Sequence, residues 1–160
     1  MRRLGLSLLL ICLVAPAAAL PADRSAGDGS LAVTSVNGKM ILQGRGLVYG
    51  HLSSGAFVVL DYRPDDPTDI SAVSGSRGRI VGGVLTYAAA SDIRFALPSG
   101  RYTIQISGAG IDLSAVGRGT LTYVGAGTAD DGLLTVNGSR LQPVTKAFGT
   151  LSYGVSSGRS

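Results

Sequence analysis

The sequence contains no tryptophan and no glutamate, and its single cysteine, Cys12, lies in an apolar N-terminal segment. A disulfide needs two cysteines, so no disulfide within the chain can stabilise the fold. One histidine and one cysteine cannot form the usual His- and Cys-rich metal site without heavy use of carboxylates. Since every acidic residue is an aspartate, nothing singles out the pair of carboxyl groups that glycoside hydrolysis needs. The sequence therefore argues against most enzyme classes, and we expect a protein without catalytic activity.

The first 22 residues have the pattern of a secretory signal peptide. Arg2 and Arg3 precede an apolar stretch from Leu4 to Val14, and small residues follow at positions 15–19. This stretch is shorter than the roughly 20 apolar residues that span a membrane. We therefore expect cleavage and export to the cell envelope or outside the cell, with an uncleaved N-terminal anchor as the alternative.

The remaining chain is long enough for one domain. Loss of Arg2 and Arg3 lowers the formal net charge from +4 to +2, which gives no support to a nucleic-acid partner. After cleavage no membrane span is expected. Residues 23–30 are small and polar and predict a flexible lead-in, residues 31–154 a single β domain, and residues 155–160 a flexible tail.

The composition favours strands over helices, because 24 glycines disfavour helices and the remaining apolar residues suit strands. Short strands separated by turn residues are predicted at 46–52, 56–62, 69–73, 78–87, 92–97, 101–107, 110–116, 119–124 and 147–154. The Asn-Gly pairs at 37–38 and 137–138 predict hairpins with type I′ turns. The triplets Gly-Arg-Gly or Gly-Ala-Gly at 44–46, 108–110 and 117–119 predict bulges or tight bends.

Three short motifs occur twice in the same order, at offsets of 45, 43 and 41 residues. They are Leu52–Phe57 with Leu97–Tyr102, Asp69–Val73 with Asp112–Val116, and Arg77-Gly78 with Arg118-Gly119. This order predicts an internal duplication of about 43 residues. With the predicted strands, it indicates an antiparallel β-sandwich or a closed barrel. A β-solenoid is the alternative, although solenoids need at least three stacked repeats.

The segment Ile111–Gly119, with the strand and turn before it, resembles a sequence found in small exported bacterial glycine-rich all-β proteins with no assigned activity. The resemblance covers about a third of the chain. It implies an exported β domain and carries no catalytic residues. The first copy departs from it by residues inserted between Val73 and Arg77.

The repeated charged residues form one candidate ligand site. Asp69 and Asp112 are the repeated acids, and Arg77 and Arg118 the repeated bases. A duplicated fold could bring them together as paired binding groups. The structural alternative is that each aspartate caps a turn and each arginine covers a strand edge, with an Asp–Arg pair within one copy.

An acidic cluster is the second candidate site. Its members are Asp61, Asp65, Asp66 and Asp69. Oxygen-rich loops bind calcium, but this spacing matches no standard calcium loop. Calcium is the one cofactor that the sequence suggests.

His51 and the aromatic residues complete the candidates. His51 with Ser53 or Ser54 and an aspartate could form a hydrolase triad, but the chain has no Gly-x-Ser-x-Gly motif. The nine tyrosines and phenylalanines could include a sugar-stacking platform, although their placement on strands makes most of them core residues. We expect a binding or structural role, with carbohydrate or cell-wall polymer as the ligand class. The alternatives are a small secreted hydrolase and a calcium-stabilised extracellular module.

Overall fold

The computed structural model describes residues 27–60, 71–73, 78–89, 92–128, 131–145 and 147–154. In these ranges the chain forms nine strands: β1 Gly29–Val59, β2 Ser71–Val73, β3 Arg79–Val81, β4 Val84–Ala89, β5 Ile93–Leu97, β6 Arg101–Gly125, β7 Leu133–Val136, β8 Gln142–Pro143 and β9 Gly149–Tyr153. The predicted signal peptide and C-terminal tail lie outside the described residues. Within the described ranges, no helix is long and apolar enough to cross a membrane.

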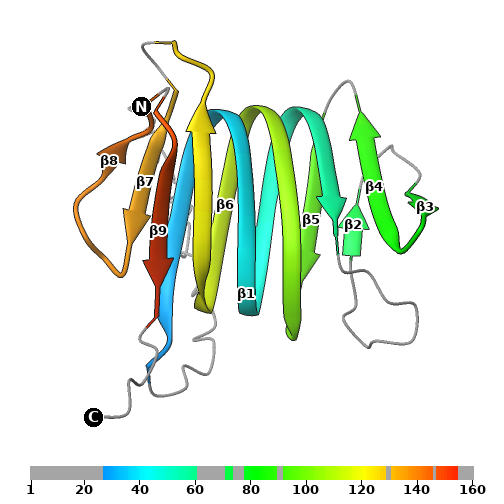
Figure 1. Ribbon diagram of the computed structural model, residues 1–160, viewed down its shortest axis with the longest axis horizontal. Coiled ribbons are helices and arrows are strands. Elements are labelled where there is room, and N and C mark those ends of the chain that lie inside the picture. Colours follow the sequence, from blue (N-terminus) through cyan, green and yellow to red (C-terminus); the bar gives the residue numbers. More distant parts are fainter. Residues whose placement is uncertain are drawn as a thin grey trace, which may run out of the picture.

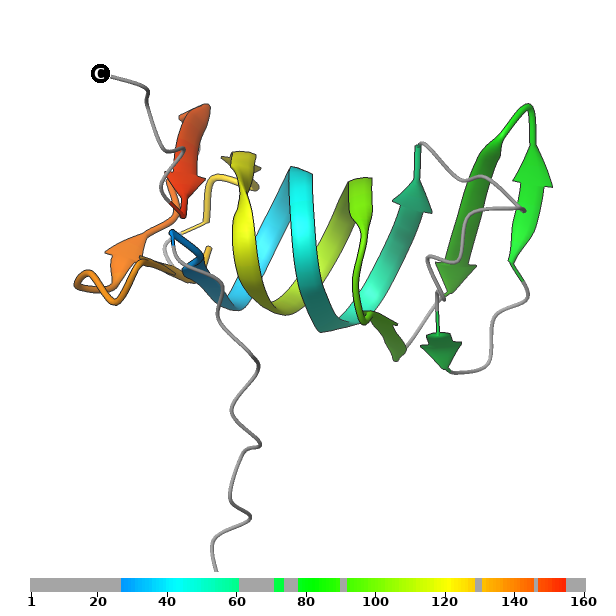
Figure 2. The same ribbon diagram turned by 90° about the horizontal axis from the view of Figure 1, so that it is seen from below.

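Two long antiparallel strands, β1 and β6, make up most of the molecule. Each is several times longer than the five or six residues of a typical strand. They wind around a common axis as an interleaved coil (Figures 1 and 2). Residues 38–45 of β1, for example, pair with residues 101–108 of β6 on one side and with 118–125 on the other. Neighbouring windings of the coil therefore come from opposite strands.

The windings build two layers. Layer A contains, in spatial order, β8, β7, residues 29–36 of β1, residues 111–117 of β6, residues 46–52 of β1, β5 and β2. Layer B contains β9, residues 118–125 of β6, residues 38–45 of β1, residues 101–108 of β6, residues 54–59 of β1, β4 and β3.

Since β1 and β6 pass through both layers, one open antiparallel sheet is folded into a sandwich. The predicted antiparallel β-sandwich is confirmed, and the closed barrel is wrong. The β-solenoid is wrong as well, because no winding of β1 stacks directly on another winding of β1.

Glycines mark the corners where the two long strands pass from one layer to the other. Gly38, Gly46, Gly55, Gly108 and Gly117 have φ values between +125° and +154°. A Cβ atom at Gly108 would lie 2.0 Å from the carbonyl oxygen of Ser54. The bends predicted at 44–46, 108–110 and 117–119 are confirmed. The strands predicted separately on either side of these bends are continuous, because glycine lets the chain turn without leaving the hydrogen-bonded ladder.

Apolar side chains alternate along the windings and fill the space between the layers. Apolar and polar residues alternate in the sequence from Arg101 to Ile106, which places Tyr102, Ile104 and Ile106 on one face, and all three are buried. Further along β6 the buried positions are Ile111 and Leu113, so the pattern changes from even to odd numbers at the 108–110 corner. The paired segment of β1 changes in the same way, from Leu52 to Phe57, so both strands keep their apolar side inside across this corner.

The side chains of two tyrosines meet over two glycines on the inner side of layer B. In the register of the sheet, Gly119 and Gly44 lie side by side between Tyr153 and Tyr102. The two tyrosine hydroxyl oxygens are 2.5 Å apart and buried, so one hydroxyl donates to the other. Burial raises the pKa of both Tyr102 and Tyr153 above the usual value of a tyrosine.

The two Asn-Gly pairs have different outcomes. The hairpin predicted at Asn37-Gly38 is wrong, because β1 continues through it; only Gly38 of the pair has positive φ, whereas a type I′ turn needs both. At Asn137-Gly138 both φ values are positive, at 50° and 74°, and β7 pairs with β8 beyond the turn. That hairpin is confirmed.

Two other sequence predictions concern the end of the sheet formed by β2, β3 and β4. The strand predicted at 78–87 is a hairpin of β3 and β4 that turns at Gly82 and Gly83. The duplication of about 43 residues remains a prediction, since part of its first copy falls in 61–70 and 74–77, outside the described residues.

Candidate functional site

The outer face of layer A carries a shallow depression of about 440 Å³. It extends over neighbouring segments of β1, β6 and β5, which pair through Tyr49, Ser114 and Ala96. Val48 and Leu52 of the same β1 segment face the core and are fully buried. Because side chains alternate along a strand, Tyr49 and His51 point outward into the depression.

Tyr49 is the most exposed aromatic residue of this face, with 51% of its surface accessible. Its partners in the adjacent strands are Ser114 and Ala96, which are both small. Small neighbours on both sides leave the face of the ring uncovered. An exposed ring at the centre of a sheet face, rather than at its edge, provides a flat apolar platform.

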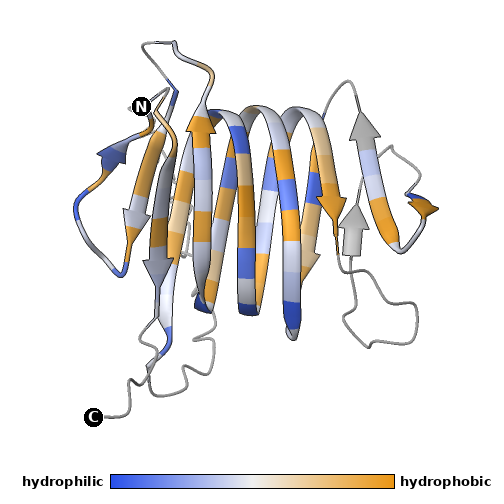
Figure 3. Ribbon diagram, viewed as in Figure 1, coloured by the Kyte–Doolittle hydropathy of each residue, from blue (hydrophilic) through white to orange (hydrophobic). Residues whose placement is uncertain are grey.

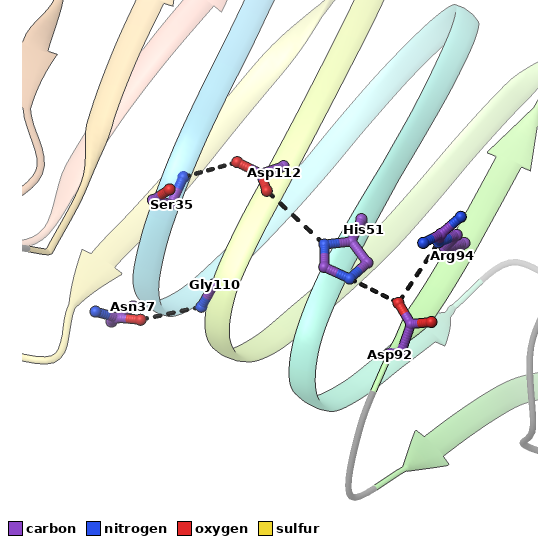
Figure 4. A network of polar contacts seen from close by, with 7 residues as sticks. All are labelled: Ser35, Asn37, His51, Asp92, Arg94, Gly110 and Asp112. Carbon is purple, nitrogen blue, oxygen red and sulfur yellow. Dashed lines mark hydrogen bonds and ion pairs between the residues drawn. The ribbon is translucent and has the colours of Figure 1, made fainter.

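A network of charged side chains surrounds His51 (Figure 4), which lines the same depression as Tyr49. The Nε2 atom of His51 is 2.8 Å from Oδ1 of Asp92, and its Nδ1 atom is 3.8 Å from Oδ2 of Asp112. Arg94 reaches the same oxygen of Asp92, with its Nε atom at 3.5 Å. The amide of Ser35 donates to Oδ1 of Asp112 at 2.9 Å. Two carboxylates thus fix the imidazole ring of His51 from opposite sides.

These groups keep the capacity to bind a polar ligand. The side chains of Asp112 and Arg94 are 51% and 67% exposed, and that of His51 is 33% exposed. An ionised carboxylate offers about four acceptor sites, and arginine offers five N–H donors. The contacts of Asp112 and Arg94 with other described residues use only some of these acceptors and donors. The depression therefore combines an apolar platform with exposed donors and acceptors.

The structure places two of the four repeated charged residues that were predicted to form one site, and these two lie in different layers. Asp112 lies in the depression of layer A, whereas Arg118 lies just after the Gly117 corner, in layer B. Arg118 pairs with Asp28, with its Nε atom 3.3 Å from Oδ1, and not with Asp112. Asp69 and Arg77 fall outside the described residues, so only half of the predicted group can be placed.

The predicted calcium cluster of Asp61, Asp65, Asp66 and Asp69 also lies in a part of the chain that the structure does not describe. Across the described ranges, no three His, Cys, Asp or Glu side chains gather as a metal site. The calcium hypothesis therefore stays untested.

For the hydrolase hypothesis, the contacts of His51 are informative. Its polar partners among the described residues are Asp92 and Asp112, and neither Ser53 nor Ser54 is among them. The hydroxyl of Ser53 lies instead against Gly110, where a Cβ atom would be 2.3 Å from it. Neither predicted serine thus contacts His51, and the hydrolase hypothesis stays a prediction.

Three residues of the depression were not singled out from the sequence: Tyr49 as distinct from the other aromatics, Asp92 and Arg94. The signal for Tyr49 was the alternation of Val48, Gly50 and Leu52, which face inward. Asp92 and Arg94 carry no local signal, because only the pairing of β5 with β1 brings them to His51. A scan against protein-family models, a search of curated proteins and a search of solved structures found no match for this chain.

Proposed function

We propose that this protein is a non-catalytic β domain that binds carbohydrate on the outer face of layer A. The exposed ring of Tyr49, with charged and polar groups on the strands beside it, is the observation that carries the proposal. The C–H face of a sugar ring packs on an aromatic ring, and its hydroxyls form hydrogen bonds with carboxylate, guanidinium and imidazole groups. Asp112, His51 and Arg94 supply all three kinds of group.

The form of the depression favours a polymer over a small enclosed ligand. The depression is open and shallow, and its lining comes from adjacent strands that run side by side. Small-molecule sites are usually concave and cover most of the ligand, whereas an extended chain can lie across a sheet face. We therefore propose a polysaccharide of the cell envelope or its surroundings as the ligand, in line with the predicted signal peptide.

Affinity electrophoresis tests the proposal, with soluble neutral polysaccharides cast one at a time into native gels. The native chain is expected to be retarded in at least one gel, and Tyr49→Ala to lose about tenfold in affinity because a central aromatic anchor is removed. Tyr49→Phe, which keeps the ring, should stay retarded. Phe148→Ala is the matched control, since Phe148 is an exposed aromatic, 74% accessible, that lies against layer B.

An equal loss of retardation in Tyr49→Ala and Phe148→Ala would contradict the proposal, as would the absence of retardation in every gel. The hydrolase alternative is tested on the same polysaccharides by an assay for reducing sugar. Release of reducing sugar by the native chain, lost in His51→Ala, would replace binding with catalysis as the function.

A further inference from the structure

Three arginines form a row across layer B, beside a corner of the coil. Arg45 of β1 lies directly opposite Arg101 of β6 on one side and opposite Arg118 of β6 on the other. Adjacent strands are about 4.8 Å apart, so the row spans about 10 Å. Directly opposed residues project from the same face of a sheet. The buried neighbours of this row, such as Tyr102, face inward, so the arginines point away from the core.

The arginine row has few compensating charges. Arg118 pairs with Asp28, with 3.3 Å between Nε and Oδ1. The side chains of Arg45 and Arg101 are exposed, and neither forms a hydrogen bond or ion pair with another described residue. Like charges placed directly opposite each other destabilise a ladder. The next outward positions of the same strands are the uncharged Gln43 and Thr103, so the like charges gather at the corner.

A second depression lies against the arginine row. Its volume is about 460 Å³, and its lining consists of Asp28, Arg45, Gly46, Gly100, Arg101 and Gly117. The glycines have no side chains, so the corner stays open beside the two guanidinium groups. Figure 3 shows strongly hydrophilic segments at the lower bends of the coil. The exposed side chains of Arg45 and Arg101 and the open depression thus lie at the same corner of the coil.

We propose that the arginine row binds an acidic polysaccharide. Guanidinium groups form paired hydrogen bonds with carboxylates, and these are among the strongest polar contacts in proteins. The exposed guanidinium groups of Arg45 and Arg101, with Arg118 beside them, match a polymer that carries one carboxylate on each sugar unit. The described residues of the lining include no aromatic side chain on which nucleic-acid bases could stack, which favours a glycan over a nucleic acid.

This site is separate from the one around Tyr49 and does not depend on it. The row lies in layer B and the Tyr49 depression in layer A. Loss of one site should therefore leave the other intact.

Binding of polygalacturonate at low ionic strength, followed by affinity electrophoresis, tests the proposal. Arg45→Gln is expected to lose about tenfold in affinity, the size of one charge-assisted contact. Arg79→Gln is the matched control: it makes the same change of net charge at an exposed position of β3, away from the row. It should bind like the native chain, and so should Tyr49→Ala.

Thermal unfolding without ligand provides a second readout. Relief of like-charge repulsion in Arg45→Gln should raise the melting temperature by about 2 °C at low salt, and added salt should remove the difference. A variant that binds less but melts higher has lost a ligand contact and not its fold. A melting temperature below that of the native chain would overturn this account of the row.

Three further outcomes would overturn the proposal. One is equal weakening by Arg45→Gln and Arg79→Gln, which would show that only overall charge matters. Another is the absence of polygalacturonate binding by the native chain. The third is tighter binding of a single-stranded oligonucleotide at the same ionic strength, which would identify a nucleic-acid site instead.

Discussion

Gly108 in the coil and Gly82 in the β3–β4 hairpin both have positive φ, at +154° and +57°, but their surroundings differ. A Cβ atom at Gly82 would meet nothing within 4 Å, whereas one at Gly108 would meet the backbone of the opposite strand. At the hairpin tip, glycine serves only the conformation of its own residue. At the corner, it also sets how closely two windings approach, so the coil is far more sensitive to substitution than the hairpin.

Substitution of the two glycines tests this difference most strongly. Gly108→Ala is expected to lower the free energy of unfolding by about 3 kcal/mol or more, because the methyl group overlaps the carbonyl oxygen of Ser54. Gly82→Ala should lower it by only about 1 kcal/mol, for the positive φ alone. Urea unfolding measures both. Similar losses in the two variants would show that the corners do not depend on close approach.

Gly44 and Gly119 show a third situation, in which backbone and a side chain both fill the space: added Cβ atoms would lie 2.4 and 2.3 Å from the carbonyl oxygens of Arg118 and Gln43. A Cβ atom at Gly119 would lie 2.8 Å from the hydroxyl oxygen of Tyr153. Tyr153→Phe is expected to lower the free energy of unfolding by about 1–2 kcal/mol, because the buried hydroxyl of Tyr102 loses its partner.

The double variant Tyr102→Phe and Tyr153→Phe sharpens this test. It should be less destabilised than the sum of the single variants, since it leaves no buried hydroxyl without a partner. Urea unfolding of all four proteins gives the interaction energy. Strict additivity would mean that the hydroxyl pair does not stabilise the coil.

The smallest expected effect concerns Asp131, where the loop after β6 closes over Gly125. The Thr128 hydroxyl donates to Oδ1 of this buried carboxylate, and the amides of Gly127 and Thr128 donate at 2.8 and 3.1 Å. These bonds, with that of the Thr128 hydroxyl first, hold the pKa of Asp131 below its usual range. The folded state therefore favours the ionised form.

The stabilisation by Asp131 should be complete above the unfolded-state pKa of about 3.9 and be lost as the pH falls through the lower folded-state value. The native chain should thus melt higher than Asp131→Asn at pH 7, and the difference should shrink below about pH 4. Melting curves from pH 2 to 7 measure it. A difference that grows on acidification would contradict the assigned direction.

The sequence predicted the fold class and the bends but not the winding. Gly46, Gly108 and Gly117 were identified as bends from their neighbours alone, and the face of Tyr102, Ile104 and Ile106 followed from simple alternation. The coil was missed because a bend was expected to end a strand. A signal for it exists: Gly29 and Gly46, Gly38 and Gly55, Gly100 and Gly117, and Gly108 and Gly125 are each separated by 17 residues. That spacing is one full winding.

The candidate sites depend on contacts that sequence order cannot show. Asp112 was chosen for its repetition, and it does lie in the depression, but its neighbours are His51 and Ser35 instead of Arg118. Arg45 was not a candidate site residue in the sequence, because only the strand register places it between Arg101 and Arg118. Long-range pairing therefore decides which polar groups act together.

The interleaving of β1 and β6 also constrains how the chain can fold. Every ladder partner of β1 lies beyond its own C-terminal end, in β4, β5, β6 and β7. During synthesis, β1 cannot form a single winding until most of β6 is available, so no stable N-terminal intermediate of the coil can precede it. Pairing over such long sequence separations is slow. The coil is thus acquired late and as one cooperative unit, and the edges of β1 that pair with β6 must stay unpaired until β6 arrives.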